Sequence, residues 1–175
     1  MVEKAVVTGG AGFIGSQLVA ALVEQGFDVH VVDNYADGKR EERINPKATY
    51  HELDVRKTDE VAKVFEGASV VYHTAAIPRV PYSVEHPVET TDVNIVGTVS
   101  TLAAAAKAKV QRVVYSSSGS SYGDQTTLPL VETMIANPVN PYGLQKYVGE
   151  LFAKIWPDIY KVETVSLRYF NVYGP

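Results

Sequence analysis

Three glycines near the start of the chain constrain its fold more than any other feature of the sequence. Gly9, Gly12 and Gly15 separate an apolar segment, Lys4–Thr8, from a helical pattern at Phe13–Gln25. In such a strand-to-helix turn the first glycine permits the tight turn, the second lets the backbone approach a pyrophosphate, and the third lets helix and sheet pack closely. The helix N-terminus adds N–H donors and the positive end of a dipole. The spacing therefore predicts a β-α-β unit that binds a dinucleotide.

The rest of the chain repeats the same alternation of short apolar runs and longer segments of helical period. This pattern is typical of parallel strands buried between helices, and it predicts an α/β fold, a Rossmann-type doubly wound parallel sheet with helices on both faces. We expect strands near Lys4–Thr8, Asp28–Asp33, Thr49–Asp54, Val70–Thr74, Arg112–Ser116 and Thr164–Tyr169. We expect helices at Phe13–Gln25, Lys57–Phe65, Glu89–Ala108 and Tyr142–Trp156, the last terminated by Pro157.

The 175 residues contain no internal repeat and no linker-like stretch, so we expect one domain over 1–175. There is no cysteine, which excludes disulfides, thiolate metal sites and cysteine nucleophiles. The four histidines lack the spacing of metal ligands, and no metal site is predicted. A formal net charge of −4 gives no electrostatic footprint for nucleic acid. A small-molecule ligand is the better interpretation.

No apolar run approaches the roughly 20 residues that span a bilayer. The N-terminal residues turn to glycines before the core of a signal peptide could develop. We therefore expect a soluble protein without a membrane partner, and the cytoplasm is the default location.

Asp33 ends the second predicted strand, eighteen residues beyond Gly15, near the spacing expected of a carboxylate that accepts hydrogen bonds from a ribose diol. A carboxylate here would repel a 2′-phosphate, so the sequence favours NAD over NADP. The basic pair Lys39 and Arg40 keeps NADP open. The plainer alternative is a tight turn followed by an ordinary capping aspartate.

Tyr142 and Lys146 are four residues apart at the start of a predicted helix, which places the phenol and the ammonium on one face. A neighbouring Lys⁺ and a positive nicotinamide ring would both favour the phenolate, making Tyr142 a credible proton shuttle. Upstream, Ser116, Ser117 and Ser118 end an apolar strand at the sheet edge where ligands bind in this architecture. Taken alone, such a Tyr and Lys are more often a surface pair.

The order of these elements resembles the short-chain dehydrogenase/reductase family. Longer motifs narrow the resemblance to its extended branch, the NAD-dependent epimerase/dehydratase family, and within it to the UDP-glucose 4-epimerase group. These motifs are TGGAGFIG at 8–15, DVR at 54–56, HTAA at 73–76, SSSGSSYG at 116–123, PYGLQK at 141–146 and RYFNVYGP at 168–175.

The resemblance implies a role for each matching residue. The catalytic residues would be Ser118, Tyr142 and Lys146, with Asn171 contacting substrate. Residues that would hold NAD are Gly9, Gly12, Phe13, Ile14 and Gly15 at the pyrophosphate, Asp33 and Asn34 at the adenosine ribose, Asp54 and Val55 at the adenine, Ala75 and Ala76 along the dinucleotide, and Lys146 at the nicotinamide ribose. Asn94 is similar to an asparagine of the long central helix, and it could equally satisfy a kink there.

In the mechanism that the resemblance implies, the phenolate takes the proton of the sugar 4-OH as hydride passes to NAD⁺. The keto sugar turns over in the pocket, and hydride returns to its other face. The substrate would be a UDP-sugar of the glucose and galactose pair.

The sequence departs from the family pattern at a few positions. Gln145 replaces the serine usual before the lysine, and we expect its side chain to point away from the phenol–ammonium face. Gly119 and Ser120 stand where 4,6-dehydratases carry an acidic pair, which disfavours dehydration. Ser121 occupies a place usually filled by valine, so the choice of catalytic serine among 118, 120 and 121 stays open.

Relatives continue well beyond the RYFN motif into a portion that supplies most of the sugar-nucleotide surface. We therefore expect the 175 residues to bind NAD with little epimerase activity alone. The resemblance also implies a homodimer through a four-helix bundle of Glu89–Ala108 and Tyr142–Trp156. Two alternatives remain: a decarboxylase, other epimerase or keto-reductase of the same branch, and a non-enzymatic NAD-binding module.

Overall fold

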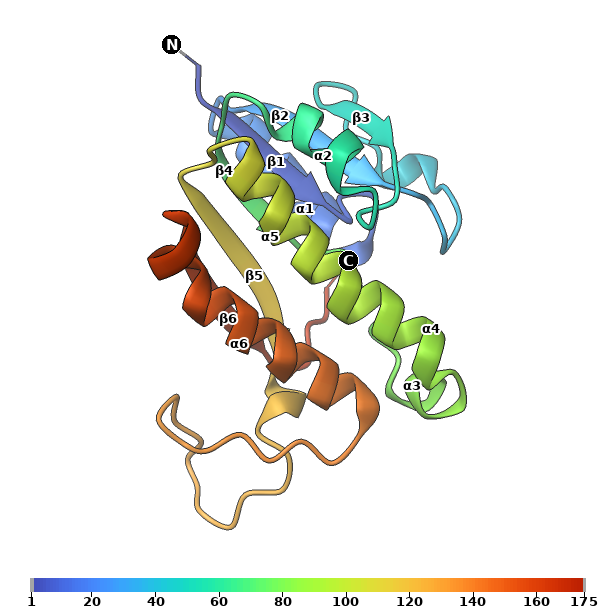
Figure 1. Ribbon diagram of the computed structural model, residues 1–175. Helices are drawn as coiled ribbons and strands as arrows, with labels where there is room; N and C mark the ends of the chain where they lie inside the picture. Colours follow the sequence, from blue (N-terminus) through green and yellow to red (C-terminus); the bar gives the residue numbers. More distant parts are fainter. Residues whose placement is uncertain (1, 175) are drawn as a thin grey trace.

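The computed structural model describes residues 2–174 and places six parallel strands in one sheet, in the order β3-β2-β1-β4-β5-β6 (Figure 1). Strand β1 pairs with β2 on one side and with β4 on the other. Because the strand order reverses between β1 and β4, the crevice beyond their carboxyl ends is the point where doubly wound sheets bind ligands. The predicted fold class is confirmed.

The strands are β1 (Lys4–Thr8), β2 (Asp28–Asp33), β3 (Thr49–Glu52), β4 (Ala68–His73), β5 (Arg112–Ser118) and β6 (Glu163–Tyr169). The helical segments are α1 (Phe13–Glu24), η1 (Glu41–Arg43), α2 (Thr58–Phe65), α3 (Val80–Glu85), α4 (Pro87–Thr91), η2 (Asp92–Val96), α5 (Gly97–Lys107), η3 (Gly119–Ser121) and α6 (Pro141–Tyr160). All six strands were predicted to within two residues at each end. The short segments η1, α3 and η3 were not predicted.

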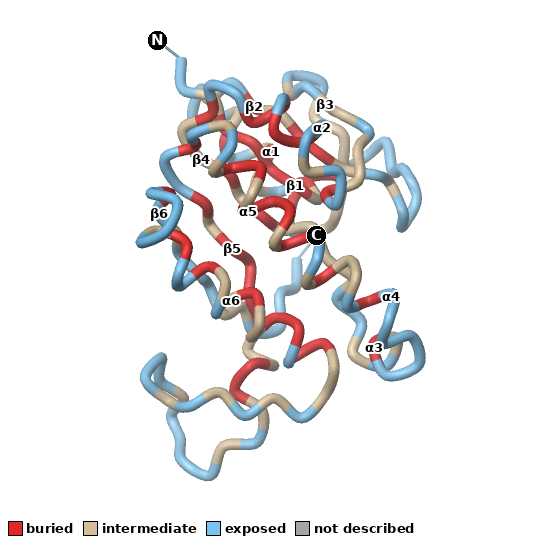
Figure 2. Tube along the Cα trace, viewed as in Figure 1, coloured by how far each residue is buried: buried red, intermediate tan, exposed pale blue. Residues whose placement is uncertain are grey.

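Two apolar cores lie on opposite faces of the sheet, because side chains alternate along each strand. On β1, Ala5 and Val7 pack with Val19 of α1, whereas Val6 faces the other core with residues of α2, α5 and α6. Figure 1 shows α5 and α6 side by side over that second face. Burial is concentrated in the strands and the inner turns of these helices, while the segment between η3 and α6 is largely exposed (Figure 2).

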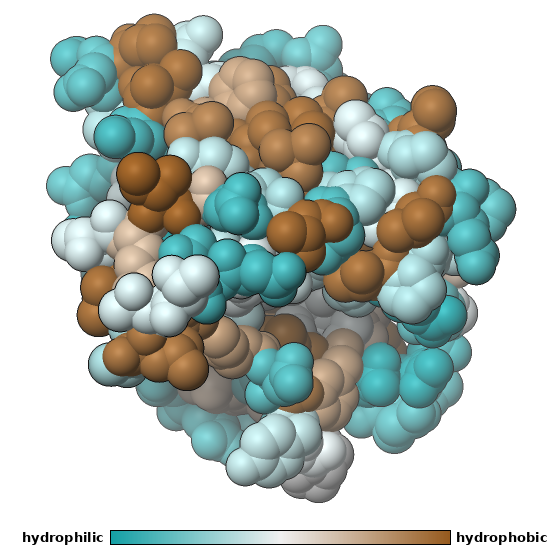
Figure 3. All heavy atoms as spheres, turned by 90° about the horizontal axis from the view of Figure 1, so that it is seen from below, coloured by the Kyte–Doolittle hydropathy of each residue, from teal (hydrophilic) through white to brown (hydrophobic). Residues whose placement is uncertain are grey.

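Apolar side chains also reach the surface, in several separate groups between polar ones on the face that Figure 3 shows. The exposed ones include Leu144, Leu151 and Ile155 on α6. Across the described residues, 2–174, no helix is both long and apolar enough to cross a membrane.

The predicted helix Glu89–Ala108 is a continuous run from Pro87 to Lys107 with a π-helical segment, η2, in its middle. The backbone N–H of Gly97 donates to the carbonyl of Asp92, five residues back. Asn94 is buried in this wider turn, and its own carbonyl accepts a hydrogen bond of 2.7 Å from the Thr98 hydroxyl. A single turn of π-helix inside an α-helix is frequent at functional sites.

Pro157 does not end α6, contrary to the prediction; it lies inside the helix, which continues to Tyr160. A proline lacks the N–H that would bond to the carbonyl four residues earlier. Here that carbonyl, of Ala153, instead accepts a hydrogen bond of 2.6 Å from the hydroxyl of Thr164 on β6. The helix therefore tolerates the proline because a neighbouring strand supplies the missing donor.

His73, at the end of β4, is a buried histidine held between two threonines. Its Nδ1 lies 2.7 Å from the Thr8 hydroxyl and its Nε2 lies 3.0 Å from the Thr98 hydroxyl. Because the Thr98 proton is donated to the Asn94 carbonyl, Nε2 carries the imidazole proton and Nδ1 accepts from Thr8. Burial, with a smaller contribution from Lys146, lowers the pKa of His73 to about 3. His73 is thus neutral in the folded protein.

This histidine should make the protein sensitive to mild acid. The unfolded state binds the proton near pH 6.5 and the folded state only near pH 3, so stability from this group is lost as pH falls through that window. Between pH 7.5 and pH 5 the loss should be about 2 kcal/mol. Denaturant unfolding should show the stability gap between the wild type and His73→Asn shrinking by that amount. A stability gap that stays constant over this pH range would contradict the assignment.

Candidate active site

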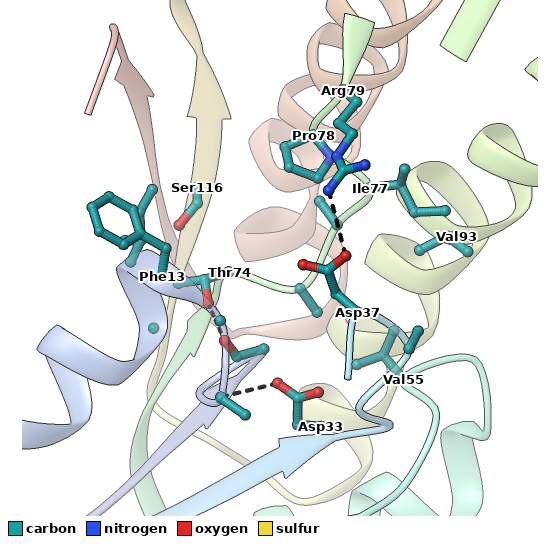
Figure 4. A pocket seen from close by; sticks show the side chains of 18 of the residues that line it. Phe13, Asp33, Asp37, Val55, Thr74, Ile77, Pro78, Arg79, Val93 and Ser116 are labelled. Atoms are coloured by element: carbon teal, nitrogen blue, oxygen red, sulfur yellow. Dashed lines mark hydrogen bonds and ion pairs between the residues drawn. The ribbon is translucent and has the colours of Figure 1, made fainter. Parts of the chain in front are cut away.

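One large cleft, with a volume of about 1370 Å³, lies at the carboxyl ends of the strands. The turn between β1 and α1 lines it together with the ends of β2, β4, β5 and β6 and the first turns of α6 (Figure 4). The cleft brings together the residues that the family resemblance assigned to cofactor, substrate or catalysis. These are Gly9, Gly12, Phe13, Ile14, Gly15, Asp33, Asn34, Asp54, Val55, Ala75, Ala76, Ser118, Tyr142, Lys146 and Asn171.

The glycine turn has no room for side chains at two of its three glycines. Gly9 has a φ of +71°, and a Cβ there would lie 2.7 Å from the backbone of Ala75. A Cβ on Gly15 would lie only 2.2 Å from the carbonyl oxygen of Gly9. The turn thus packs tightly against the end of β4 and the start of α1. Gly9, Gly12 and Gly15 also line the cleft, which places the backbone of the turn at its surface, as a pyrophosphate-binding turn requires.

Asp33 ties this turn to the end of β2. Its Oδ2 accepts a hydrogen bond of 3.0 Å from the backbone N–H of Ala11, and its Oδ1 accepts one of 2.8 Å from that of Tyr35. A carboxylate offers about four acceptor positions, so both oxygens keep capacity for hydroxyl groups in the cleft. The capping role and the ribose role are therefore compatible.

Asp54 and Val55 form the wall beyond Asp33. Arg56 donates from its Nε to Asp54 Oδ1 at 2.9 Å, and its guanidinium also pairs with Asp92 of the π-helical segment. The hydrogen bonds from Arg56, which outweigh burial, hold the pKa of Asp54 below its ordinary value. This end of the cleft is fixed by ion pairing to the central helix.

The segment after β4, residues 74–80, forms the opposite wall. Figure 4 shows Thr74, Ile77 and Pro78 on this wall, and the ion pair between Arg79 and Asp37 across the pocket. The nitrogen–oxygen distance of that pair is 3.5 Å, and both side chains are mostly exposed. Such an exposed pair contributes little to stability, but it joins the two loops that border the cleft.

The start of α6 is fixed by local sequence and by close packing. Asn140 caps the helix by accepting a hydrogen bond of 2.8 Å from the N–H of Gly143, and Pro141 occupies the first turn. A Cβ on Gly143 would lie 2.6 Å from the carbonyl oxygen of Ser120, and one on Gly149 would lie 2.3 Å from the Tyr115 hydroxyl. These two glycines let α6 approach β5 and η3, which brings Tyr142 and Lys146 beside the serines.

Tyr142 and Lys146 are both buried. Lys146 Nζ donates to the Ser116 carbonyl at 2.8 Å and lies 6.0 Å from the centre of the Tyr142 ring. Burial raises the pKa of the Tyr142 phenol, although a hydrogen bond with Ser118 opposes the rise, and burial lowers the pKa of Lys146 to about 8. The expected phenolate is therefore not favoured by the protein alone, because desolvation of the phenol outweighs its hydrogen bond with Ser118. The positive nicotinamide ring of a bound cofactor is the other group that was expected to favour the phenolate form of Tyr142.

The three candidate serines occupy different places. Ser118 and Ser120 line the cleft, and the Ser118 hydroxyl accepts a hydrogen bond of 3.1 Å from the Ser120 N–H. Ser121 is fully buried and lies 3.5 Å from the Ser117 hydroxyl. It is not among the residues that line the cleft. The geometry therefore favours Ser118, the only one of the three that affects the pKa of Tyr142.

A buried ion pair between Glu150 and Arg168 packs against the end of β5, the strand that carries Ser116, Ser117 and Ser118. Glu150 of α6 accepts from Arg168 of β6 through both carboxylate oxygens, at 2.9 and 2.7 Å, and also from the Ser117 hydroxyl. The Arg168 guanidinium lies 4.3 Å from the centre of the Tyr122 ring. Arg168 is thus a structural residue that connects β6, α6 and the end of β5.

Several cleft residues were not predicted. They lie on the segments that follow β2, β4 and β6. Their position just after a parallel strand was the feature of the sequence that could have indicated them. These residues are Tyr35, Asp37, Arg43, Ile77, Pro78, Arg79, Val80, Tyr82 and Phe170; Val93 of η2, which also lines the cleft, was not predicted either. Gln145 was predicted to point away from the phenol–ammonium face, and its side chain does so, into hydrogen bonds with α4 and η2 that the sequence did not indicate.

Comparison with known proteins shows the family of this chain. The family model of the NAD dependent epimerase/dehydratase family matches residues 5–175. The chain belongs to this family. Among the relatives of this family member, a putative UDP-glucose 4-epimerase of Methanocaldococcus jannaschii is 44% identical over 96% of this chain and 55% of its own length. The UDP-glucose 4-epimerase of Lactobacillus helveticus is 40% identical over 98% of this chain and 52% of its own length.

Solved structures in the same family share the fold. A UDP-glucose 4-epimerase from Thermotoga maritima, solved with UDP-glucose, has a TM-score of 0.93 and 36% identity, covering 98% of this chain and 57% of that one. A UDP-glucose 4-epimerase from Brucella ovis, in complex with NAD, has a TM-score of 0.92 and 34% identity, covering 97% and 52%. This epimerase/dehydratase family member therefore spans about half the length of the relatives it matches.

Proposed function

We propose that this chain binds NAD in the cleft and forms the cofactor-binding part of a UDP-glucose/UDP-galactose 4-epimerase. The single observation that carries the proposal is the shared cleft. It unites the glycine turn and Asp33 with Ser118, Tyr142 and Lys146 of distant segments. Relatives that match almost all of this chain are UDP-glucose 4-epimerases, and one of similar structure was solved with NAD.

The residues present fit NAD. At Gly9, Gly12 and Gly15 the turn lines the cleft with backbone atoms and no side chains, so a pyrophosphate could lie against it. Asp33 has acceptor capacity for the adenosine ribose, and Asp54 and Val55 would border the adenine. Lys146, four residues beyond Tyr142, would hold the nicotinamide ribose. When bound, NAD supplies the group that takes up and returns the hydride of the sugar carbon.

In the proposed reaction, Tyr142 moves the proton and Ser118 orients the sugar. The phenol oxygen of Tyr142 takes the proton of the sugar 4-OH and later returns it. The Ser118 hydroxyl, already close enough to affect the pKa of Tyr142, hydrogen-bonds the same sugar oxygen. Because burial raises the pKa of Tyr142, positive charge from Lys146 and the nicotinamide must offset desolvation for the phenolate to form. Asn171, at the end of β6, would contact the substrate from the open side of the cleft.

Calorimetry and a product assay test this function together. The wild type and Tyr142→Phe should bind NAD with similar affinity, since the phenol oxygen is the only group removed. Residues 1–175 alone should interconvert UDP-glucose and UDP-galactose slowly, and Tyr142→Phe should abolish that residual activity. Absence of NAD and NADP binding would overturn the proposal. Residual activity that survives in Tyr142→Phe would remove Tyr142 from the mechanism.

The preference for NAD should depend on Asp33. In Asp33→Ser the carboxylate that repels a 2′-phosphate is gone, while Arg40 and Arg43 still line the cleft. The ratio of the NADP and NAD dissociation constants should therefore fall by about tenfold. Asp37→Ser, which removes an acidic group of the same cleft that is paired with Arg79, is the matched control. An equal fall in both variants would contradict the role of Asp33.

The homodimer belongs to the same proposal. Leu144, Leu151 and Ile155 on α6 are about half exposed, and their spacing places them along one side of the helix. Exposed apolar stripes of this kind are typical of helix–helix interfaces. A four-helix bundle with the helices of a second copy would cover them.

A further inference from the structure

Gln145 lies between Tyr142 and Lys146 in the sequence, yet its side chain faces a different part of the molecule. It is 2% exposed. Its Oε1 accepts a hydrogen bond of 2.7 Å from Asn94 Nδ2. Its Nε2 donates to the hydroxyls of Thr90 at 2.9 Å and Thr91 at 3.1 Å. One side chain of α6 thus joins the end of α4 to the π-helical segment η2.

Asn94 in turn contacts the wall of the cleft through hydrogen bonds to the backbone of Ile77. Its Oδ1 accepts a hydrogen bond of 2.8 Å from the backbone N–H of Ile77, and its Nδ2 donates to the Ile77 carbonyl at 3.1 Å. Both polar groups of the Ile77 backbone are therefore held by one side chain. Ile77 belongs to the segment after β4 that lines the cleft, and Figure 4 shows it on the same wall as Pro78 and Val93.

The two amides leave no hydrogen-bonding group unused. Each side-chain amide has one acceptor oxygen and two N–H donors. Gln145 uses its oxygen for Asn94 and its two donors for the threonines, and Asn94 uses its oxygen and one donor for Ile77 and the other donor for Gln145. A buried network that is fully satisfied fixes one geometry, because any displacement leaves polar groups unpaired.

We infer that Gln145 is a positioning residue. Through Asn94 it fixes the position of Ile77, in the cleft wall formed by residues 74–80, relative to α6, the helix that carries Tyr142 and Lys146. The effect on cofactor binding rests on the proposed function, that this cleft binds NAD. A side chain that ends at its γ atom, such as serine, is two bonds shorter and could not hold the Asn94 amide in this way. The π-helical segment η2 is part of this hydrogen-bond network, because it contains Asn94.

The substitution Gln145→Met tests the inference, since methionine keeps the length of the side chain and removes all three hydrogen bonds. Amide hydrogen exchange at Ile77, without cofactor, should speed up by at least about tenfold relative to exchange at Val6 in the buried strand β1. A general loss of stability would accelerate exchange at both amides. Loss of the hydrogen bonds that hold Asn94 against Ile77 would accelerate exchange at Ile77 alone. The dissociation constant for NAD should rise by about tenfold. Gln111→Met, the same change at an exposed position, should leave both values unchanged.

A milder variant keeps the test decisive if Gln145→Met does not fold. Thr90→Val keeps the shape of the side chain and removes one of the two acceptors of Gln145 Nε2, so it should change both quantities in the same direction by a smaller factor. Exchange at Ile77 that follows exchange at Val6 in every variant would overturn the inference. Failure of the wild type to bind NAD would refute the proposed function instead, and the exchange measurement would still decide the role of Gln145.

Discussion

Gly15→Ala should reduce the affinity for NAD by at least about a hundredfold. The new Cβ would lie 2.2 Å from the Gly9 carbonyl oxygen, 2.8 Å from Gly10 Cα and 2.9 Å from the Gly9 carbonyl carbon. All three are backbone atoms of the turn, so no side-chain rotation can relieve the overlap. The turn itself must move by about an ångström, and its N–H groups then no longer converge on a pyrophosphate.

Calorimetric titration with NAD would measure this loss, and near-ultraviolet circular dichroism would establish that the variant is folded. Gly174→Ala is the matched control, because a Cβ there meets nothing within 4 Å among residues 2–174. A Gly15→Ala variant that binds NAD within threefold of the wild type would show that this turn does not contact the cofactor.

The second large effect is expected on stability, from Glu150→Leu. This change removes the acceptor of two Arg168 hydrogen bonds and of the Ser117 hydroxyl, at a site where the Glu150 and Arg168 side chains are 12% and 16% exposed. An arginine side chain is not deprotonated in proteins, so in this variant the Arg168 guanidinium stays charged and loses its carboxylate partner. Breaking a buried pair on one side costs about 3 kcal/mol.

Equilibrium unfolding in denaturant would measure this cost. The double variant Glu150→Leu/Arg168→Leu should recover much of it, since a buried ion pair can be replaced by apolar residues with little loss. Glu163→Leu breaks the exposed pair with Arg112 and should cost under about 1 kcal/mol. If Glu150→Leu costs no more than Glu163→Leu, the pair does not hold β6 against α6.

The sequence was sufficient to predict the sheet and the turn, because both depend on local patterns. Valine-rich runs gave the strands to within two residues, and Gly9, Gly12 and Gly15 gave the turn. The same patterns predicted which side chains line the cleft, since parallel strands all end at one edge of the sheet. What remained unpredicted depends on contacts between distant segments. Pro157 stays helical because Thr164 supplies a donor to Ala153, and no local rule could show that donor.

The electrostatics of the site also depend on tertiary structure. The spacing of Tyr142 and Lys146 correctly predicted their shared surroundings, but it did not show how deeply both would be buried. Burial raises the pKa of the phenol and lowers that of the amine, which is opposite to the expected direction for Tyr142. The direction of the Gln145 side chain was predicted, but its partners Asn94 and Thr90 were not, because they are about fifty residues away in the chain.

The position of β4 beside β1 also has a consequence for how the protein is made. While the chain leaves the ribosome, β2 and β3 can pair on one side of β1, but its other side has no partner until Ala68–His73 has emerged. During that interval an apolar strand edge is open to any extended segment. Nascent chains that stop before β4 should therefore recruit chaperones, and release should follow once the fourth strand has closed the gap.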